Sequence, residues 1–232
     1  MDLRNKVVLL TGAGRGIGKA IALSLAKEGA KLALAARSQK ELEHVAAECR
    51  NLKTDTAVFP TDMRDEKQVR AMVEATVKQF GKLDILINNA GLGHFKPVAE
   101  LTTAQWDEMF EVNLRGVFIA TNAALPHLRS AKESFVVNLA SLAGKNTFVG
   151  GGGYAATKWG LRAFSQCLML EERKYGVRVL SVCPGSVDTG FSLHGGKKDI
   201  IQPEDVAETI LLALKMPQRT MVSEIDIRPT SP

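Results

Sequence analysis

The stretch that decides the fold covers residues 7–18 and reads VVLLTGAGRGIG. In it, a short apolar run is followed by a glycine-rich turn and then by a helical pattern. Glycines let the chain turn tightly and let backbone N–H groups approach a pyrophosphate at the positive N-terminus of a helix. The strand before the glycines and the helix after them favour a phosphate-binding turn over the alternative, a purely structural turn. The G-x-x-x-G-x-G spacing predicts that the binding residues are Gly12, Arg15, Gly16, Ile17 and Gly18.

Outward from this turn, short aliphatic runs alternate with helical patterns along the whole chain. The predicted strands are Val7–Leu10, Lys31–Ala36, Thr56–Phe59, Leu83–Ile87, Ser134–Leu139, Val177–Val182 and Val222–Asp226. The predicted helices are Gly16–Glu28, Lys40–Leu52, Glu66–Phe80, Thr103–His127, Tyr154–Tyr175 and Pro203–Leu214. Apolar strands that alternate with helices indicate a parallel sheet covered on both faces, joined by right-handed crossovers. We predict an α/β fold, a Rossmann-type doubly wound sheet of about seven parallel strands, in a single domain over residues 1–232.

The composition excludes several classes of function. The net charge of +5 is spread over a chain without any block of five like charges, which argues against nucleic-acid binding. The three cysteines and four histidines are too dispersed for a disulfide framework or a metal site. The first apolar run is too short for a signal peptide or a membrane span. We therefore expect a cytoplasmic protein with no membrane and no nucleic-acid partner.

Polar and small residues follow the predicted strands at their carboxyl ends, where such sheets bind ligands. Asp62, followed by Met63, closes the third strand, and a carboxylate there can accept a hydrogen bond from an adenine amino group. Asn88-Asn89-Ala90-Gly91 ends the fourth strand with small residues that leave room for a ribose. The alternatives are an Asx turn for the second motif and a helix N-cap for the first, where Asp65 is the better cap.

The end of the second strand predicts which dinucleotide binds. A carboxylate there binds the 2′-hydroxyl of NAD, whereas an arginine accommodates the 2′-phosphate of NADP. The sequence Ala35-Ala36-Arg37 has no carboxylate, and Arg15 could add a second positive charge. We predict NADP(H) as the cofactor, in preference to NAD(H).

Tyr154 and Lys158 are four residues apart and therefore share one helix face. An ammonium beside a phenol favours the phenolate, which makes the tyrosine a candidate proton donor and acceptor. Such a pair also occurs by accident on helix surfaces, so its meaning depends on the motifs that accompany it.

Together these motifs, in this order, resemble those of the short-chain dehydrogenase/reductase family from Lys6 to about Pro229. The resemblance implies that Tyr154 is the acid/base and that Lys158 lowers its pKa and binds the nicotinamide ribose. It implies that Ser141 hydrogen-bonds the substrate oxygen and that Asn113 helps to hold a proton-relay water.

The resemblance also implies further binding residues and an assembly. The implied cofactor contacts are Asn88, Ala90, Gly91, Pro184, Gly185, Val187 and Thr189. A short substrate lid is implied at about residues 190–200. Family members commonly pair through two long helices, here around Asn113 and Trp159, so we expect a homodimer or homotetramer.

The implied function is NADP(H)-dependent interconversion of a ketone and a secondary alcohol by hydride transfer. A 3-oxoacyl-thioester reductase is the first candidate, but Leu170 stands where carrier-protein reductases often have an arginine. A small ketone, hydroxy acid or sugar is the alternative substrate. A non-catalytic NADPH-sensing protein and a methyl-donor-dependent transferase are the alternatives from other classes. Both fit less well, because the sensor usually loses the tyrosine or lysine and the transferase leaves the pair unexplained.

Three features leave both a functional and a structural interpretation open. Gly150–Gly153 is either a close wall beside the substrate or a loose loop. His94 and Phe95 either touch the substrate or pack their own loop. Lys197-Lys198 either attracts an anionic substrate or is merely solvated.

Overall fold

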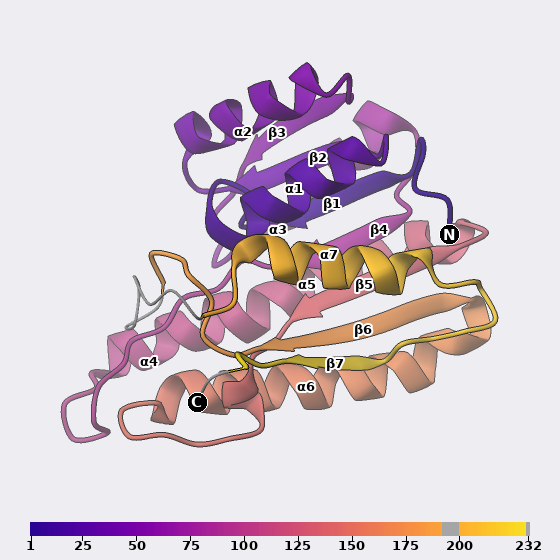
Figure 1. The fold of residues 1–232 in the computed structure, drawn as a ribbon. Helices are drawn as coiled ribbons and strands as arrows, with labels where there is room; N and C mark the ends of the chain where they lie inside the picture. The colour runs from indigo at the N-terminus through magenta and orange to yellow at the C-terminus, as the bar shows by residue number, and fades with distance from the viewer. Residues whose placement is uncertain (192–199, 231–232) are drawn as a thin grey trace.

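The computed structural model describes residues 1–191 and 200–230 of the chain, and these form one seven-stranded parallel sheet with helices on both faces (Figure 1). The strand order is β3-β2-β1-β4-β5-β6-β7. The strands are β1 (Val7–Thr11), β2 (Lys31–Ala36), β3 (Thr56–Pro60), β4 (Ile85–Asn88), β5 (Ser134–Leu139), β6 (Val177–Pro184) and β7 (Glu224–Ile227). The Rossmann-type doubly wound fold predicted from the alternating pattern is confirmed.

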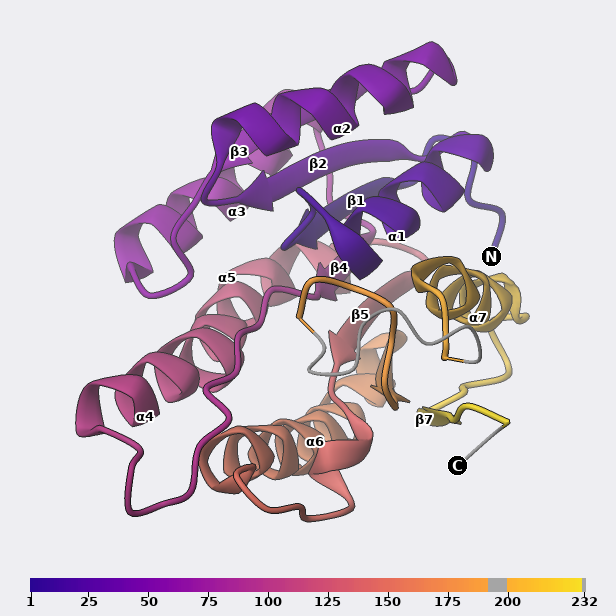
Figure 2. The same ribbon diagram turned by 60° about the vertical axis from the view of Figure 1, so that its left-hand side comes forward.

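The helices form two layers because successive strand residues point to opposite faces. The helices are α1 (Gly16–Lys27), α2 (Gln39–Asn51), α3 (Glu66–Phe80), α4 (Thr103–Phe110), α5 (Gly116–Ser130), α6 (Gly152–Glu172) and α7 (Pro203–Lys215). Helices α1, α2 and α7 pack on the face that carries Val8 and Leu10. Helices α3, α5 and α6 pack on the face that carries Val7 and Leu9 (Figures 1 and 2). Short turns η1 (Glu111–Arg115), η2 (Leu142–Gly144) and η3 (Arg173–Tyr175) complete the described elements.

The register brings the carboxyl ends of the strands to one edge of the sheet. Leu10 of β1 is paired with Ile87 of β4, and Leu139 of β5 is paired with Val182 of β6. The chain runs outward in one direction through β2 and β3 and in the other from β4 to β7. The carboxyl ends of the paired strands β1 and β4 therefore mark the topological switch point, where such sheets bind their ligands.

Most predicted elements are found with boundaries shifted by a few residues, as in β7, which covers Glu224–Ile227 and not the predicted Val222–Asp226. The single helix predicted over Thr103–His127 is α4, a π-helical segment η1 and α5. The strand predicted over Leu83–Ile87 begins and ends later, so that Asn88 is its last residue. The lid predicted at about 190–200 falls mostly on residues 192–199, which lie outside the described residues, as do Lys197 and Lys198.

Candidate active site

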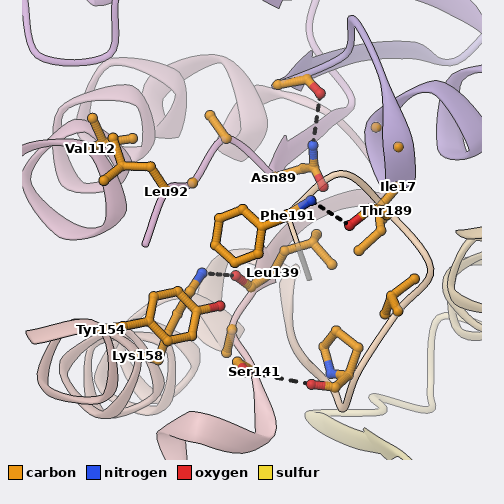
Figure 3. Close-up of a pocket in the computed structure, with 18 of the residues that line it drawn as sticks. Ile17, Asn89, Leu92, Val112, Leu139, Ser141, Tyr154, Lys158, Thr189 and Phe191 are labelled. Atoms are coloured by element: carbon orange, nitrogen blue, oxygen red, sulfur yellow. Dashed lines mark hydrogen bonds between the residues drawn. The ribbon is translucent and has the colours of Figure 1, made fainter. Parts of the chain in front are cut away.

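A cavity of about 1030 Å³ opens at the carboxyl edge of the sheet (Figure 3). The loops after β1 to β6 all contribute to its lining. The predicted site residues that line it are Gly12, Arg15, Gly16, Ile17, Gly18, Arg37, Asp62, Met63, Ala90, Gly91, Ser141, Tyr154, Lys158, Pro184, Gly185, Val187 and Thr189. Two predicted residues, Asn88 and Asn113, do not line it.

The glycine turn places the N-terminus of α1 against this cavity. Gly12 and Gly16 have φ values of 65° and 52°, which favour glycine. A Cβ atom on Gly18 would lie 2.0 Å from the carbonyl oxygen of Gly12, so only glycine fits there. Within the described residues, no side chain caps the start of α1. Its first N–H groups are therefore free to hold an anion, which fits the pyrophosphate of a dinucleotide.

Asn89, which the sequence prediction missed, fastens the glycine turn to the end of β4. Its side-chain amide donates hydrogen bonds of 3.0 Å to the carbonyl oxygens of both Thr11 and Gly12. The backbone N–H groups of Asn89 and Ala90 in turn donate to the Thr11 hydroxyl. The duplicated asparagine in the sequence was the available signal, but only the exact end of β4 tells the two apart.

Asn88 does not lie where the sequence prediction placed it. Its side chain is buried within the fold and donates to the side chains of Asn138, at 2.8 Å, and Thr121, at 3.2 Å. As the last residue of β4, it points into the layer beneath the sheet instead of into the cavity. Its side chain therefore links β4 to β5 and α5, and Asn89 takes the position at the cavity.

Charged residues line the cavity where β1 and β2 end. Arg15 and Arg37 are exposed, and neither forms an ion pair with a described residue. Glu41, in the first turn of α2, also lines the cavity, and its carboxylate lies 3.0 Å from the place of a Cβ atom on Gly14. The sequence prediction considered only the residues directly after β2, where no carboxylate occurs. Glu41 lies further along the chain, and the turn into α2 places it at the same end of the cavity.

Asp62 lines the cavity, but its carboxylate is already engaged by Arg64. The Arg64 side chain and backbone N–H both donate to it, and the guanidinium holds the pKa of that carboxyl below its usual range. Asp65 caps α3 by accepting from the backbone N–H groups of Lys67 and Gln68, as the alternative interpretation expected. Asp62 is thus available to a ligand only as an ion-paired carboxylate.

Tyr154 and Ser141 both line the cavity, and their side chains are close enough for the Ser141 hydroxyl to oppose the rise in the pKa of the phenol. Tyr154 lies in the first turns of α6 and is only 8% exposed. Ser141 begins the turn η2 and accepts a hydrogen bond from the N–H of Ala143 at 3.1 Å. The two hydroxyls are therefore placed to share one oxygen atom of a ligand.

Lys158 lies one helical turn beyond Tyr154 and is also buried. Its Nζ donates to the carbonyl oxygen of Leu139 at 2.7 Å and lies 5.7 Å from the centre of the Tyr154 ring. Burial lowers the pKa of Lys158 to about 8 and raises the pKa of Tyr154 to about 12, the latter opposed by the nearby Ser141 hydroxyl. The expected lowering of the tyrosine pKa is therefore not found, because desolvation of the phenolate outweighs the other effects. The phenol is neutral and the ammonium is mostly protonated at neutral pH.

Asn113 supports the site without lining the cavity. It sits in the π-helical segment η1 and is fully buried. Its amide donates to the carbonyl oxygen of Leu92 at 2.8 Å and to the hydroxyl of Thr157 at 3.1 Å, and it accepts from the Leu92 N–H. These contacts hold the loop after β4 against the helix that carries Tyr154. The structure thus gives Asn113 a positioning role.

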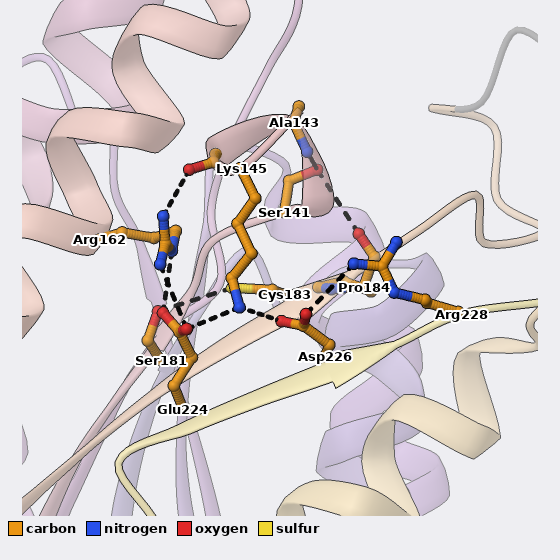
Figure 4. A network of polar contacts seen from close by, with 11 residues as sticks. Ser141, Ala143, Lys145, Arg162, Ser181, Cys183, Pro184, Glu224, Asp226 and Arg228 are labelled. Atoms are coloured by element: carbon orange, nitrogen blue, oxygen red, sulfur yellow. Dashed lines mark hydrogen bonds and ion pairs between the residues drawn. The ribbon is translucent and has the colours of Figure 1, made fainter. Parts of the chain in front are cut away.

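A group of ion pairs braces the Ser141 turn from the side of β7 (Figure 4). Arg162 of α6 donates to the carbonyl oxygen of Gly144 at 2.7 Å and to the carboxylate of Glu224 at 2.8 Å. Lys145 bridges Glu224 and Asp226. Turn η2 is therefore tied to α6 and to the last strand of the sheet.

Three phenylalanines form an aromatic wall around Tyr154, and we use this name for Phe95, Phe148 and Phe191. All three line the cavity. The ring centres of Phe95 and Phe191 lie 5.3 Å and 5.7 Å from that of Tyr154. His94 instead pairs with Glu108 at 2.9 Å and does not line the cavity.

No group of histidine, cysteine, aspartate and glutamate side chains in residues 1–191 and 200–230 could hold a metal ion. None of the helices in that part of the chain combines the length and the apolar character needed to span a bilayer.

Comparison with known proteins gives consistent matches over the whole chain. The family described as short chain dehydrogenase matches residues 6–198. An uncharacterized oxidoreductase of Staphylococcus aureus (strain USA300) is 37% identical over 230 residues, which are 98% of each chain. An alcohol dehydrogenase from the archaeon Thermococcus sibiricus, complexed with 5-hydroxy-NADP, has a TM-score of 0.92 and 34% identity over 98% of this chain and 97% of that one. A metagenomic short-chain oxidoreductase in complex with NADP has a TM-score of 0.89 and 32% identity over 99% of both chains. The chain belongs to the short-chain dehydrogenase family of oxidoreductases.

Proposed function

We propose that the protein is an NADP(H)-dependent oxidoreductase that interconverts a ketone and a secondary alcohol, with Tyr154 as the acid/base. One observation carries this proposal. Tyr154, Ser141 and Lys158 converge in the same cavity that receives the glycine turn at the start of α1. A dinucleotide whose pyrophosphate sits on that turn and a small carbonyl compound beside Tyr154 can therefore share one site.

The neutral phenol suits Tyr154 to donate its proton to a carbonyl oxygen. A bound nicotinamide supplies the hydride at the carbonyl carbon in reduction and accepts it in oxidation. As negative charge develops on the substrate oxygen, Tyr154 transfers its proton there while the Ser141 hydroxyl donates a hydrogen bond. The Lys158 ammonium stabilises the phenolate that remains, since opposite charges attract strongly in a dry site. Solvent then returns a proton to Tyr154.

The preference for NADP(H) rests on Arg15 and Arg37. Both are exposed, line the cavity, and are not ion-paired with any described residue, so both can bind a 2′-phosphate. The solved relatives in complex with 5-hydroxy-NADP and NADP support the same choice. Glu41 is the observation that favours NAD(H) instead, because a carboxylate at this end can accept from a ribose 2′-hydroxyl.

Replacement of the tyrosine tests the catalytic role. Tyr154→Phe removes one hydroxyl and keeps the ring, so NADPH affinity should stay within about twofold while turnover falls at least a hundredfold. NADPH binding is measured by fluorescence titration and turnover by oxidation of NADPH with a panel of ketones.

Tyr175→Phe is the matched control, because Tyr175 lies at the opposite, amino end of β6. Equal turnover of Tyr154→Phe and the wild type would refute the assignment. A wild-type protein that binds NADPH but reduces no ketone would favour the non-catalytic sensor.

A pair of substitutions tests the cofactor choice. Arg37→Ala should weaken NADPH binding about tenfold or more and leave NADH binding almost unchanged, because it removes a charged contact to phosphate. Glu41→Gln should strengthen NADPH binding by removing a negative charge from the same end. If Glu41→Gln instead weakens NADH binding, and NADH binds wild-type protein more tightly than NADPH, the cofactor is NAD(H).

We also propose a homodimer that pairs through the helices around Asn113 and Trp159. Trp106 of α4, Phe118 of α5 and Trp159 of α6 are 39%, 51% and 47% exposed, which leaves apolar surface on three helices that all contact η1. A second, smaller hollow of about 390 Å³ lies along η1 and is lined in part by Phe118. Sedimentation analysis of the wild type and of Phe118→Glu tests this pairing, and a monomeric wild type would refute it.

A further inference from the structure

We propose that the substrate is an uncharged ketone, or the matching secondary alcohol, that carries a ring or another bulky apolar group, and that the aromatic wall is its binding subsite. This inference rests on the proposed function and names its substrate class. It selects among the substrates that the catalytic residues alone leave open, which include thioesters, hydroxy acids and sugars.

The aromatic wall surrounds the hydroxyl-bearing ring of Tyr154 from two sides. Phe95 and Phe191 are perpendicular to each other, with their ring centres 5.9 Å apart, and both contact Tyr154. Figure 3 shows Phe191 beside Tyr154. Phe148 extends the wall beyond Phe95 at 6.0 Å. A group bonded to the carbonyl carbon must therefore lie against phenyl rings when its oxygen reaches Tyr154 and Ser141.

The loops that carry Phe95 and Phe191 are anchored, although part of the wall faces solvent. Phe148 and Phe191 are 44% and 43% exposed, which leaves apolar surface at the mouth of the cavity for a ligand to cover. The loop that carries Phe95 is anchored by the pairing of its neighbour His94 with Glu108. The Phe191 N–H donates to the Thr189 hydroxyl at 3.3 Å. Two of the three loops that form the wall are thus fixed by their own polar contacts.

Two glycines make room for the rings. A Cβ atom on Gly93 would lie 2.7 Å from the Phe95 ring and 3.2 Å from the Phe191 ring. A Cβ atom on Gly151 would lie 2.6 Å from the Phe148 ring. The backbone therefore approaches all three phenylalanines more closely than any other residue would allow. For Gly151, this favours the interpretation of the glycine run as a close wall.

The charges of the described lining residues lie away from this wall, apart from Lys158 beside Tyr154. Arg15, Arg37, Glu41 and Asp62 all follow β1, β2 or β3. Around the wall the lining is uncharged: Leu92 and Val149 are apolar, and Asn146 and Thr147, which precede Phe148, are polar. A carboxylate or phosphate on the substrate would lose its hydration there without gaining an oppositely charged partner among these residues, which costs binding. Binding of an apolar ring is favourable there, because it removes apolar surface from water.

Four ketones test the proposal with wild-type protein and NADPH, and again with NADH. They are 1-cyclohexylethanone, butan-2-one, 4-acetylcyclohexane-1-carboxylate and the acetoacetyl thioester of coenzyme A. We expect kcat/KM for 1-cyclohexylethanone to exceed each of the others at least about tenfold, since the ring fills an apolar pocket. The inference is overturned if butan-2-one, the carboxylated ketone or the thioester is used as well or better.

Substitutions in the wall supply a second readout that a general structural defect would not give. Phe95→Leu and Phe148→Leu should each lower kcat/KM for 1-cyclohexylethanone about tenfold, change butan-2-one less than about twofold, and leave NADPH affinity unchanged. The control is Tyr175→Leu, which removes an aromatic ring at the opposite end of the sheet that is 45% exposed, about as much as Phe148. It should keep the wild-type ratio of kcat/KM for 1-cyclohexylethanone to that for butan-2-one. A ratio that is unchanged in both wall variants overturns the inference.

The proposed function and the aromatic subsite would be refuted by different results. If no ketone is reduced with either cofactor, the proposed function is wrong and the inference falls with it. If ketones are reduced in a Tyr154-dependent manner but the charged ones are preferred, the proposed function stands and the aromatic subsite is refuted.

Discussion

The ammonium of Lys158 is bound to the carbonyl oxygen of Leu139 at 2.7 Å, so the charged group on α6 is fixed by the last residue of β5. Ser141 follows Leu139 by two residues and starts the next turn. One strand end therefore positions both partners of Tyr154. This arrangement keeps a positive charge buried next to a neutral phenol, and it has consequences for the pH dependence of activity and of stability.

Reduction of a ketone should be fastest below pH 8 and should decline above it. The reaction needs a neutral Tyr154 and a charged Lys158. Burial raises the pKa of the tyrosine to about 12, so it stays neutral, but lowers the pKa of the lysine to about 8. The charge is therefore lost as the pH rises through about 8. A pH profile of kcat/KM measures this. In Lys158→Arg the decline should move well above pH 8, because arginine stays charged, and an unmoved decline would mean that another group causes it.

Relative to Lys158→Met, the free energy of unfolding of the wild type should rise between about pH 8 and pH 10. The buried thiols of Cys49 and Cys183, whose pKa values are raised, oppose this rise above about pH 9 in both proteins. An unfolded lysine has a pKa of 10.5, and the folded Lys158 has a pKa of about 8. At pH 7 the buried charge therefore destabilises the folded state, and this destabilisation disappears as the charge is lost. The difference in pKa corresponds to about 3 kcal/mol. Above pH 10 the raised pKa of Tyr154 acts in the opposite direction, since only the unfolded tyrosine ionises there. Denaturant titrations at several pH values give the free energy of unfolding of both proteins. The difference between wild type and Lys158→Met should show the rise. The exposed control Lys174→Met should retain it.

The sequence was sufficient to predict the sheet and the edge that holds the site. Continuous apolar strands and the glycine turn at the start of α1 depend on local sequence, and the strand ends then follow from the parallel topology. The π-helical segment around Asn113 was not predictable in this way. It accompanies contacts of the asparagine amide with Leu92 and Thr157, which are distant in sequence.

Substitution of Gly18 should destabilise the protein and weaken cofactor binding together. The added Cβ atom in Gly18→Ala would lie 2.0 Å from the Gly12 carbonyl oxygen, so the turn or the helix must shift. We expect a loss of about 1–3 kcal/mol of stability and at least about a tenfold rise in the NADPH dissociation constant. Gly81→Ala is the control, because Gly81 is left-handed at the end of α3 with open space around it. It should cost about 1 kcal/mol without changing NADPH affinity. Unchanged affinity in Gly18→Ala would mean that the turn does not hold the cofactor.

The composition of the cavity wall was less accessible from the sequence than the catalytic residues were. Tyr154 and Lys158 lie four residues apart on one helix, and such spacing can be read directly. Phe95, Phe148 and Phe191 come from three separate loops, where no periodicity relates one residue to another. The choice between Asn88 and Asn89 depended on the exact last residue of β4, and boundaries are the least reliable part of such predictions.

The ion pairs behind Ser141 should matter for turnover and not only for stability. Arg162 is 16% exposed and ties the Gly144 carbonyl of turn η2 to Glu224 of β7, so Arg162→Leu should let the Ser141 turn shift. We expect kcat to fall about tenfold to a hundredfold, because small misplacements of a reacting group are costly, while NADPH affinity is unchanged.

The control is Arg129→Leu, which breaks a comparable pair with Glu172 near the far end of α6. It should lose a similar amount of stability, about 2–3 kcal/mol, at full kcat. Single-turnover and denaturation measurements on both variants separate the effects. Equal losses of kcat in the two would show that the brace acts only through global stability.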